Sequence, residues 1–242
     1  MQNRTEGPST KERRRVLSFL KPYSETVYRE LPLPLRAVIF DYGKVLTGPP
    51  DPEAHDAILK ITRLSPECLD KLYWTDRHAY DEGKLTGLEY WQKFAREAKL
   101  NLSAAQLDEV NDWDARMWTT ENAPMLAWQL VLKQRGFLTA ILSNMGDHVH
   151  RLMQREFDWL SRFDLCVWSY ELGVAKPDPA IYLHTLKEIH IMPEEALFLD
   201  DKQPNIDAAC ALGIRGILFQ DAETLRADLI AYGFDKALPL PG

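Results

Sequence analysis

Long apolar runs are the first feature that this 242-residue chain lacks. No segment approaches the roughly 18 to 20 uninterrupted apolar residues that a membrane-spanning helix requires, and the N-terminus lacks the apolar stretch of a signal peptide. We therefore expect a cytoplasmic protein without a membrane partner. Hydrophobic residues make up 45% of the chain and charged residues 27%, which is enough to bury one substantial core, or a core and a small second lobe.

Cysteine is scarce, and a net positive charge is absent. The three cysteines, Cys68, Cys166 and Cys210, match neither a disulfide framework nor a paired zinc site, and we expect reduced, partly buried thiols. The formal net charge of -7 gives no general attraction to nucleic acid or to anionic lipid, so we expect no nucleic-acid partner. An anionic ligand would need local cations and backbone N–H groups.

Five short apolar segments, each followed by a polar residue, predict the strands of the fold. They are residues 35–40, 138–142, 165–168, 196–199 and 215–219. Continuous apolarity, rather than alternation, is typical of strands that are buried on both faces. The segments therefore predict a parallel sheet, and the helical patterns between them predict an α/β fold.

The long interval between the first and second predicted strands, residues 48–122, shows helical patterns only. Residues 86–89 (TGLE) and 103–106 (SAAQ) both fit the capping-box pattern at a helix start. In a parallel α/β sheet the ligand binds beyond the carboxyl ends of the strands. Helices inserted directly after the first strand are therefore expected to lie over the ligand site.

These patterns divide the chain into three predicted parts. Residues 1–34 form an N-terminal extension, residues 35–47 and 123–242 form the core, and residues 48–122 form a small, all-helical cap. Several polar and aromatic cap residues have side chains able to line a cavity, but we assign all of them to packing or to the surface: Asp76, His78, Tyr80, Trp113, Asp114 and Trp118.

Polar residues at the predicted strand ends suggest chemistry. At or after the carboxyl ends of the strands lie Asp41, Ser143, Lys176, Asp200 and Asp201. Acidic groups that converge there would repel one another, and their pKa values would rise, unless a cation shares the space. Mg²⁺ is the expected cation because it prefers oxygen ligands and binds through one or two carboxylates plus a substrate phosphate. We therefore expect Asp41 and Asp201 to bind Mg²⁺.

Four ordered segments resemble the motifs of haloacid dehalogenase-like hydrolases. They are residues 38–46 (VIFDYGKVL), 141–144 (ILSN), 176–182 (KPDPAIY) and 198–201 (FLDD), and the resemblance extends over roughly residues 35–219. It implies a Rossmann-like, three-layer parallel sheet with a small helical cap inserted after the first strand. That architecture agrees with the helical interval described above.

The resemblance also implies roles on the substrate side of the site. Asp41 would be the nucleophile that forms an aspartyl-phosphate from a small phosphorylated metabolite. Lys176 would neutralise the charge of the nucleophile and of the phosphoryl group. The hydroxyl of Ser143 and the backbone N–H of Asn144 would hold phosphate oxygens. The implied activity is hydrolysis of phosphate monoesters.

On the metal side, the resemblance implies that Mg²⁺ binds Asp41, the backbone carbonyl of Gly43 and Asp201, with Asp200 as a more distant supporter. Gly43 departs from the usual phosphatase motif, in which a second Asp at that position protonates the leaving oxygen and then activates water. Such general acid–base help is typically worth about 10²–10⁴ in rate, so its loss matters most for a poor leaving group.

The first motif is similar to that of α-glucose-1-phosphatase-like members of the family, which also lack the second Asp. This similarity suggests a sugar phosphate as the substrate, because an anomeric oxygen leaves more easily than an ordinary alkoxide. Lys44 is a further departure from the motif, and its side chain either faces the substrate cavity or is solvated.

Two other functions stay open. A 2-haloacid dehalogenase shares the Asp nucleophile and the missing second Asp, but that branch works without a metal, and the adjacent pair of Asp200 and Asp201 argues against it. A catalytically weak binding or regulatory protein of the same fold is the other, because Gly43 cannot activate water. The sequence leaves the oligomeric state unknown.

Overall fold

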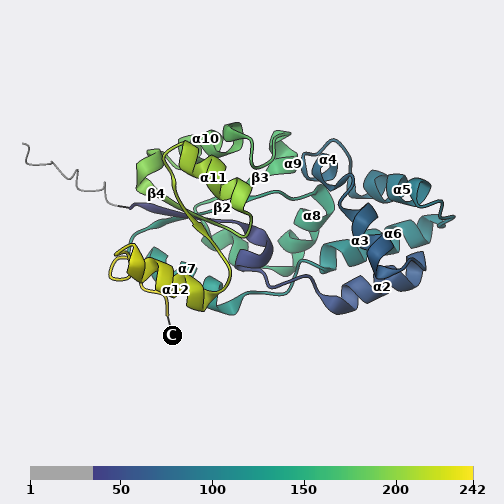
Figure 1. Cartoon of the computed structure of the whole chain (residues 1–242), viewed down its shortest axis with the longest axis horizontal. Coiled ribbons are helices and arrows are strands. Elements are labelled where there is room, and N and C mark those ends of the chain that lie inside the picture. The colour runs from purple at the N-terminus through teal and green to yellow at the C-terminus, as the bar shows by residue number, and fades with distance from the viewer. Residues whose placement is uncertain (1–34, 242) are drawn as a thin grey trace, which may run out of the picture. The chain divides into compact units, whose positions relative to one another are not determined.

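One five-stranded parallel sheet organises residues 35–241, the part of the chain that the computed structural model describes (Figure 1). Its strands are β1 (Ala37–Phe40), β2 (Leu138–Ser143), β3 (Leu165–Trp168), β4 (Ala196–Asp200) and β5 (Arg215–Leu218). In space their order is β3-β2-β1-β4-β5. The predicted α/β fold is confirmed, whereas the extension expected at residues 1–34 lies outside the described residues.

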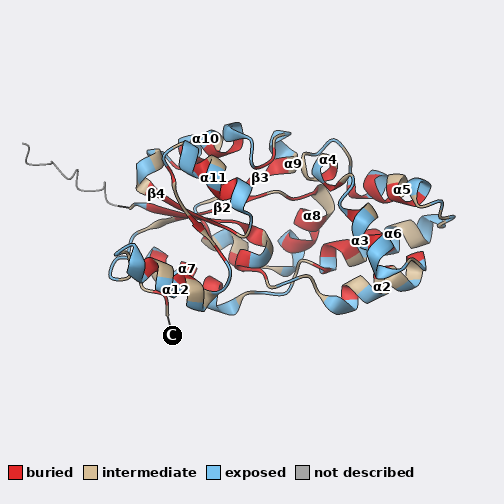
Figure 2. Ribbon diagram, viewed as in Figure 1, coloured by how far each residue is buried: buried red, intermediate tan, exposed pale blue. Residues whose placement is uncertain are grey.

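Burial on both faces explains why the strands are apolar without alternation. All residues of β1 and β4 are buried (Figure 2). Along β1, Val38 and Phe40 belong to one apolar layer, while Ala37 and Ile39 belong to the other. A central parallel strand has no face toward solvent, so each of its positions takes an apolar residue.

Helices cover both faces of the sheet and complete the predicted three layers (Figure 1). The layer that includes Val38 is built with α7 (Ala123–Gln134), α8 (Asp147–Glu156) and α12 (Ala222–Ala231). The layer that includes Ile39 is built with α10 (Pro179–Glu188) and α11 (Gln203–Ala211). Shorter helical turns connect these elements: η1 (Tyr42–Leu46), η2 (Trp159–Arg162), α9 (Ser169–Leu172) and η3 (Pro193–Glu195).

The interval between β1 and β2 is helical, as predicted. Its helices are α2 (Pro52–Thr62), α3 (Pro66–Tyr73), α4 (Arg77–Asp81), α5 (Gly87–Glu97) and α6 (Ala104–Arg116). Both capping boxes form, with Thr86 at the start of α5 and Ser103 at the start of α6. These helices share their own apolar cluster around Trp91. We call residues 48–122 the cap, although their boundaries stay a prediction.

The three cysteines were expected to be partly buried, and the structure agrees for one of them. Cys166 is half-buried, but Cys68 and Cys210 are exposed, so the expected partial burial is wrong for these two free thiols. They lie on helices α3 and α11 at positions that leave the residue exposed, although Cys210 Sγ also lies close to Gly216 of β5. Among residues 35–241, no helix is long and apolar enough to span a membrane.

The cap contacts the core at the N-terminus of α8. The carboxylate of Asp147 accepts a hydrogen bond from the backbone N–H of Gly87 at 2.9 Å, and the hydroxyl of Tyr80 accepts one from the backbone N–H of His148 at 3.3 Å. Gly146 makes this close approach possible, because the ring of Tyr80 occupies the space that a Cβ atom at position 146 would need.

Gly146→Ala should therefore destabilise the protein. Tyr80 is fully buried and cannot turn aside, so the added methyl group forces a shift that typically costs about 1–3 kcal/mol. Gly48→Ala is the matched control, because its Cβ would lie 3.5 Å from the nearest atom of Thr120, an ordinary contact. Urea denaturation measures the free energy of unfolding of both variants. Equal stability of the two would contradict the assigned contact.

Candidate active site

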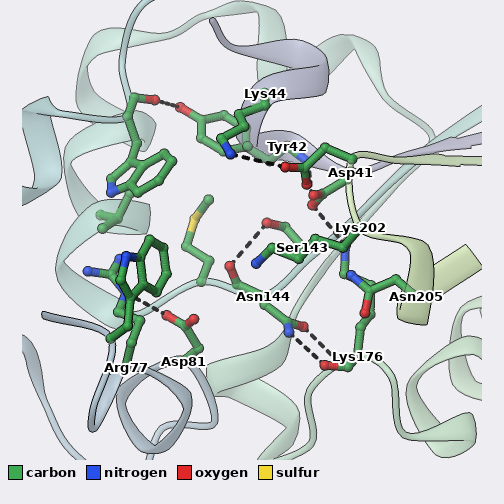
Figure 3. Close-up of a pocket in the computed structure, with 16 residues that line it drawn as sticks. Asp41, Tyr42, Lys44, Arg77, Asp81, Ser143, Asn144, Lys176, Lys202 and Asn205 are labelled. Atoms are coloured by element: carbon green, nitrogen blue, oxygen red, sulfur yellow. Dashed lines mark hydrogen bonds and ion pairs between the residues drawn. The ribbon is translucent and has the colours of Figure 1, made fainter. Parts of the chain in front are cut away.

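Three carboxylates meet at the carboxyl edge of the sheet. Asp41 follows β1, Asp200 ends β4, and Asp201 comes next in the chain. The strands are neighbours in register, with Phe40 opposite Leu199, and the backbone N–H of Asp41 donates to the carbonyl of Leu199 at 2.8 Å. One oxygen of each acid lies within 4.8 Å of the others. The structure thus brings together the acidic groups that the sequence placed at one edge, and Asp41 is seen in the pocket beside them (Figure 3).

A buried lysine joins two of these acids. The ammonium of Lys176 lies 2.8 Å from Asp41 Oδ1, 2.7 Å from Asp200 Oδ2 and 2.8 Å from the carbonyl oxygen of Leu142. Its side chain is 1% exposed. Burial acts to lower the pKa of Lys176, but the attraction of Asp200 and Asp41 outweighs it and raises the pKa above its usual value. Lys176 is therefore a fixed positive charge at the centre of the site.

Asp41 is held through one of its two oxygens. Oδ1 accepts hydrogen bonds from the backbone N–H of Tyr42 at 2.7 Å and from Lys176, whereas no described residue bonds to Oδ2. Burial raises the pKa of Asp41 to about 7, because the repulsion of Asp200 and Asp201 adds to desolvation and Lys176 offsets only part of it. The carboxylate is thus oriented, with one oxygen left available.

Asp200 and Asp201 differ in access although they are adjacent. Asp200 is fully buried, and both of its oxygens accept hydrogen bonds, from the Asn205 side chain, from the backbone N–H of Lys202 and from Lys176. Asp201 is partly exposed, and within residues 35–241 its one ion pair is with the ammonium of Lys44, which lies 3.3 Å from Oδ2. Asp201 is therefore free to bind an ion, while Asp200 is occupied in holding its neighbours.

The predicted phosphate-binding residues lie beside Lys176. Ser143 is buried at the end of β2, and its hydroxyl donates a long, 3.4 Å hydrogen bond to the carbonyl of Asn144. The Asn144 side chain accepts from the backbone N–H of Lys176 and donates to its carbonyl, both at 2.8 Å. No described residue accepts a hydrogen bond from the backbone N–H of Asn144. Sequence reasoning missed the role of this side chain in positioning Lys176.

Gly43 and Lys44 form the turn η1 after Asp41. The Lys44 backbone is left-handed, with a φ of 60°, and its N–H donates to the Thr47 hydroxyl at 3.2 Å. Its side chain lines the pocket and is also half exposed, so both alternatives left open for Lys44 hold in part. A Cβ at position 43 would meet only the Trp118 ring, at 3.9 Å. Gly43 lines the pocket, and a metal-binding role for its carbonyl stays a prediction.

The cap closes the pocket opposite the acids (Figure 3). Its contribution is Trp74, Arg77, Asp81 and Trp118, none of which was assigned to the site from the sequence. Trp118 packs against the apolar clusters and also lines the pocket, so its assignment to packing or surface is incomplete. Asp76 pairs with Lys93 instead, Asp114 and Trp113 belong to the interior of the cap, and Tyr80 is buried where the cap meets the core.

One signal in the sequence points to the missed cap residues. Asp114 falls on the apolar stripe of α6, four residues after Val110 and three before Met117, and all three side chains are buried. A buried carboxylate requires a partner, because an isolated charge is very costly in a protein interior. A search for that partner leads to Arg77, whose Nη1 lies 2.9 Å from Asp114 Oδ1.

Comparison with known proteins gives several matches. Bifunctional epoxide hydrolase 2 of Sus scrofa is 36% identical over 112 residues, which are 45% of this chain and 20% of that protein. (S)-2-haloacid dehalogenase 1 of Pseudomonas sp. (strain CBS-3) is 26% identical over 196 residues, which are 76% of this chain and 84% of that enzyme. The matched region covers 20% of the length of each of the three mammalian epoxide hydrolases, so this chain spans only a small part of those relatives.

The fold also matches solved structures. A HAD family enzyme from Bacteroides thetaiotaomicron, in complex with magnesium and inorganic phosphate, is 22% identical with a TM-score of 0.64, over 77% of this chain and 95% of that one. In addition, the family model of the haloacid dehalogenase-like hydrolases matches residues 35–213. This range contains strands β1 to β4 and the three clustered carboxylates. The chain therefore belongs to the haloacid dehalogenase-like hydrolase family.

Proposed function

We propose that this hydrolase is a Mg²⁺-dependent phosphoric monoester hydrolase that acts through an aspartyl-phosphate on Asp41. The observation that carries the proposal is the cluster of three carboxylates around the buried ammonium of Lys176. The substrate is a small phosphorylated metabolite, and the similarity of the first motif favours a sugar phosphate. A cytoplasmic location and the absence of nucleic-acid partners belong to the same proposal.

The donor set fits Mg²⁺. It consists of carboxylate oxygens only, and these lie close enough together to share one ion. Asp41 and Asp201 would hold the ion, with the Gly43 carbonyl as a third ligand and Asp200 in support. When bound, Mg²⁺ would offset negative charge on the phosphate. The Mg²⁺ and phosphate in the Bacteroides relative support this assignment.

The residues of the chain divide the reaction between them. The free oxygen of Asp41 attacks phosphorus, the bond from phosphorus to the ester oxygen breaks, and the released alkoxide takes a proton from solvent because Gly43 offers none. Lys176 neutralises charge, while Ser143 and the Asn144 N–H orient phosphate oxygens. Water then attacks the aspartyl-phosphate, which releases inorganic phosphate and restores the Asp41 carboxylate.

A dehalogenase is the main rival, since a (S)-2-haloacid dehalogenase is among the relatives. The three clustered carboxylates favour the phosphatase. They repel one another unless a cation lies between them, and a dehalogenase that works without a metal has no use for such a cation site. Phosphate release from p-nitrophenyl phosphate with Mg²⁺ supports the proposal, whereas chloride release from 2-chloropropionate with EDTA present overturns it. A phosphorylated Asp41 that accumulates without turnover would instead indicate a weak or regulatory protein.

Asp41→Asn should lower kcat on p-nitrophenyl phosphate by a factor on the order of 10³ or more, because the amide keeps the shape of the side chain but cannot act as the nucleophile. Asp158→Asn is the matched control, since that side chain is 94% exposed and is not among the residues that line the pocket. Phosphate release and thermal unfolding are measured for both variants. Wild-type turnover in Asp41→Asn would refute the assigned chemistry.

Mg²⁺ should raise the melting temperature of the wild-type protein. An ion that binds only the folded state stabilises it by about 2.7 kcal/mol when its concentration is about 100 times Kd. Asp201→Asn should lose most of this shift, because it removes the accessible carboxylate of the cluster. Differential scanning calorimetry with and without MgCl₂ provides the comparison. An undiminished shift in Asp201→Asn would place the ion elsewhere.

Gly43→Asp should accelerate hydrolysis of an alkyl ester such as n-hexyl phosphate by at least about tenfold, the lower end of what a positioned proton donor supplies. The gain on p-nitrophenyl phosphate should be smaller, since nitrophenolate leaves without a proton. The new Cβ meets no close atom, because the Trp118 ring lies 3.9 Å from it. Gly43→Asn serves as the control of equal shape, and an equal gain in both variants would argue against proton transfer.

A further inference from the structure

A buried arginine of the cap reaches the pocket. Nη1 of Arg77 donates to both oxygens of Asp114, at 2.9 and 3.0 Å, and to the hydroxyl of Tyr73. The guanidinium also lies over the rings of Tyr73 and Tyr80, at 4.9 and 5.0 Å from their centres. The residue is 6% exposed. Arg77 is therefore fixed in place before any ligand arrives.

Asp81, one helical turn after Arg77, lies next to it in the pocket wall. Its Oδ1 accepts a hydrogen bond from Arg77 Nε at 3.1 Å. Among the described residues, no hydrogen bond within 3.5 Å involves Arg77 Nη2 or Asp81 Oδ2, although the side chain of Tyr90 also interacts with the guanidinium. Both residues line the same pocket as Asp41 (Figure 3). The cap thus presents a hydrogen-bond donor beside an acceptor, opposite the nucleophile.

An exposed aromatic face adjoins this pair. Trp74 is 54% exposed and lines the same pocket, and the ammonium of Lys202 lies 5.8 Å from the centre of its ring. Lys202 also interacts electrostatically with Asp81. The wall therefore combines an apolar surface with charges of both signs, and Arg77 and Lys202 balance the two nearby carboxylates, Asp81 and Asp114.

The balance of charge restricts the leaving group. The balanced charges give a second carboxylate or phosphate on the substrate no net attraction to this wall, and direct contact with Asp81 would be repulsive. A purely apolar group would cover Arg77 and Asp81 without hydrogen bonds, which is costly for charged groups. A hydroxyl can accept from Arg77 Nη2 and donate to Asp81 Oδ2, and the C–H groups of the same molecule can lie on Trp74.

We propose that Arg77 and Asp81 determine specificity by binding the hydroxyl groups of an uncharged, polyhydroxylated leaving group, a polyol or a sugar. This inference rests on the proposed phosphatase function and adds the residues that select the substrate.

Four primary phosphate esters of three classes test the proposal: glucose 6-phosphate and sorbitol 6-phosphate as hydroxylated substrates, n-hexyl phosphate as the apolar one and phosphoglycolate as the anionic one. The wild-type enzyme should hydrolyse at least one hydroxylated ester with kcat/KM about tenfold or more above those of the other two classes. Release of phosphate in the presence of Mg²⁺ gives all the values.

Asp81→Ala should then lower kcat/KM for the hydroxylated ester about 10- to 100-fold more than for n-hexyl phosphate, mostly through KM, because hydrogen bonds to charged groups are worth that much. Asp76→Ala is the matched control, since Asp76 immediately precedes the same helix, α4, but pairs with Lys93 outside the pocket. Its kcat/KM ratio between the two substrates should equal that of wild type. If Asp81→Ala unfolds, Asp81→Asn and Trp74→Leu provide the comparison.

The outcomes separate the two proposals. Hydrolysis of n-hexyl phosphate or phosphoglycolate in preference to the hydroxylated esters would overturn the specificity proposal and leave the phosphatase intact. An equal loss on all substrates in Asp81→Ala would do the same. Absence of phosphate release from every ester, including p-nitrophenyl phosphate, would overturn the phosphatase function and with it the specificity proposal.

Discussion

The buried ion pairs of Lys176 are the constraint on which the rest of this structure depends. Three carboxylates gather at one edge of a sheet, and within the described residues a single buried ammonium stands among them. The fold tolerates this because Asp200 is also held by Asn205 and by a backbone N–H. Removing one partner of such a buried pair is strongly destabilising. The negative charge that remains in excess is what a divalent cation would offset.

The direction of the strands explains why cap residues are placed to contact a substrate. Parallel strands direct their carboxyl ends, and so Asp41 and Asp201, to one side of the molecule, and the residues inserted after β1 cover that side. The cap then needs rigid polar groups of its own to select a substrate. Burial of Asp114 beneath Arg77 supplies that rigidity, because the pair fixes the guanidinium before a ligand binds.

The sequence predicts what depends on local pattern and on chain order. Apolar segments locate the five strands, and local hydrogen bonding locates the helix starts at Thr86 and Ser103. Strand ends in a parallel sheet must share one edge, which is why the acidic cluster could be anticipated. The placement of Trp118 and Asp81 depends instead on how cap helices pack on the core, a tertiary contact with no period or motif of its own. Burial of Asp114 was the one local sign of it.

Burial and metal binding act on Asp41 in opposite directions. Desolvation and the neighbouring acids raise its pKa to about 7, so the carboxylate is only partly ionised near neutral pH when Lys176 alone opposes them. A divalent cation favours the ionised form and would lower that pKa. Ion binding at the cluster would therefore favour ionisation of Asp41, the proposed nucleophile. Gly43 offers no proton to the leaving oxygen, which a second Asp at this position would supply. A leaving group that departs easily, and that fits against Arg77 and Asp81, would compensate for this loss.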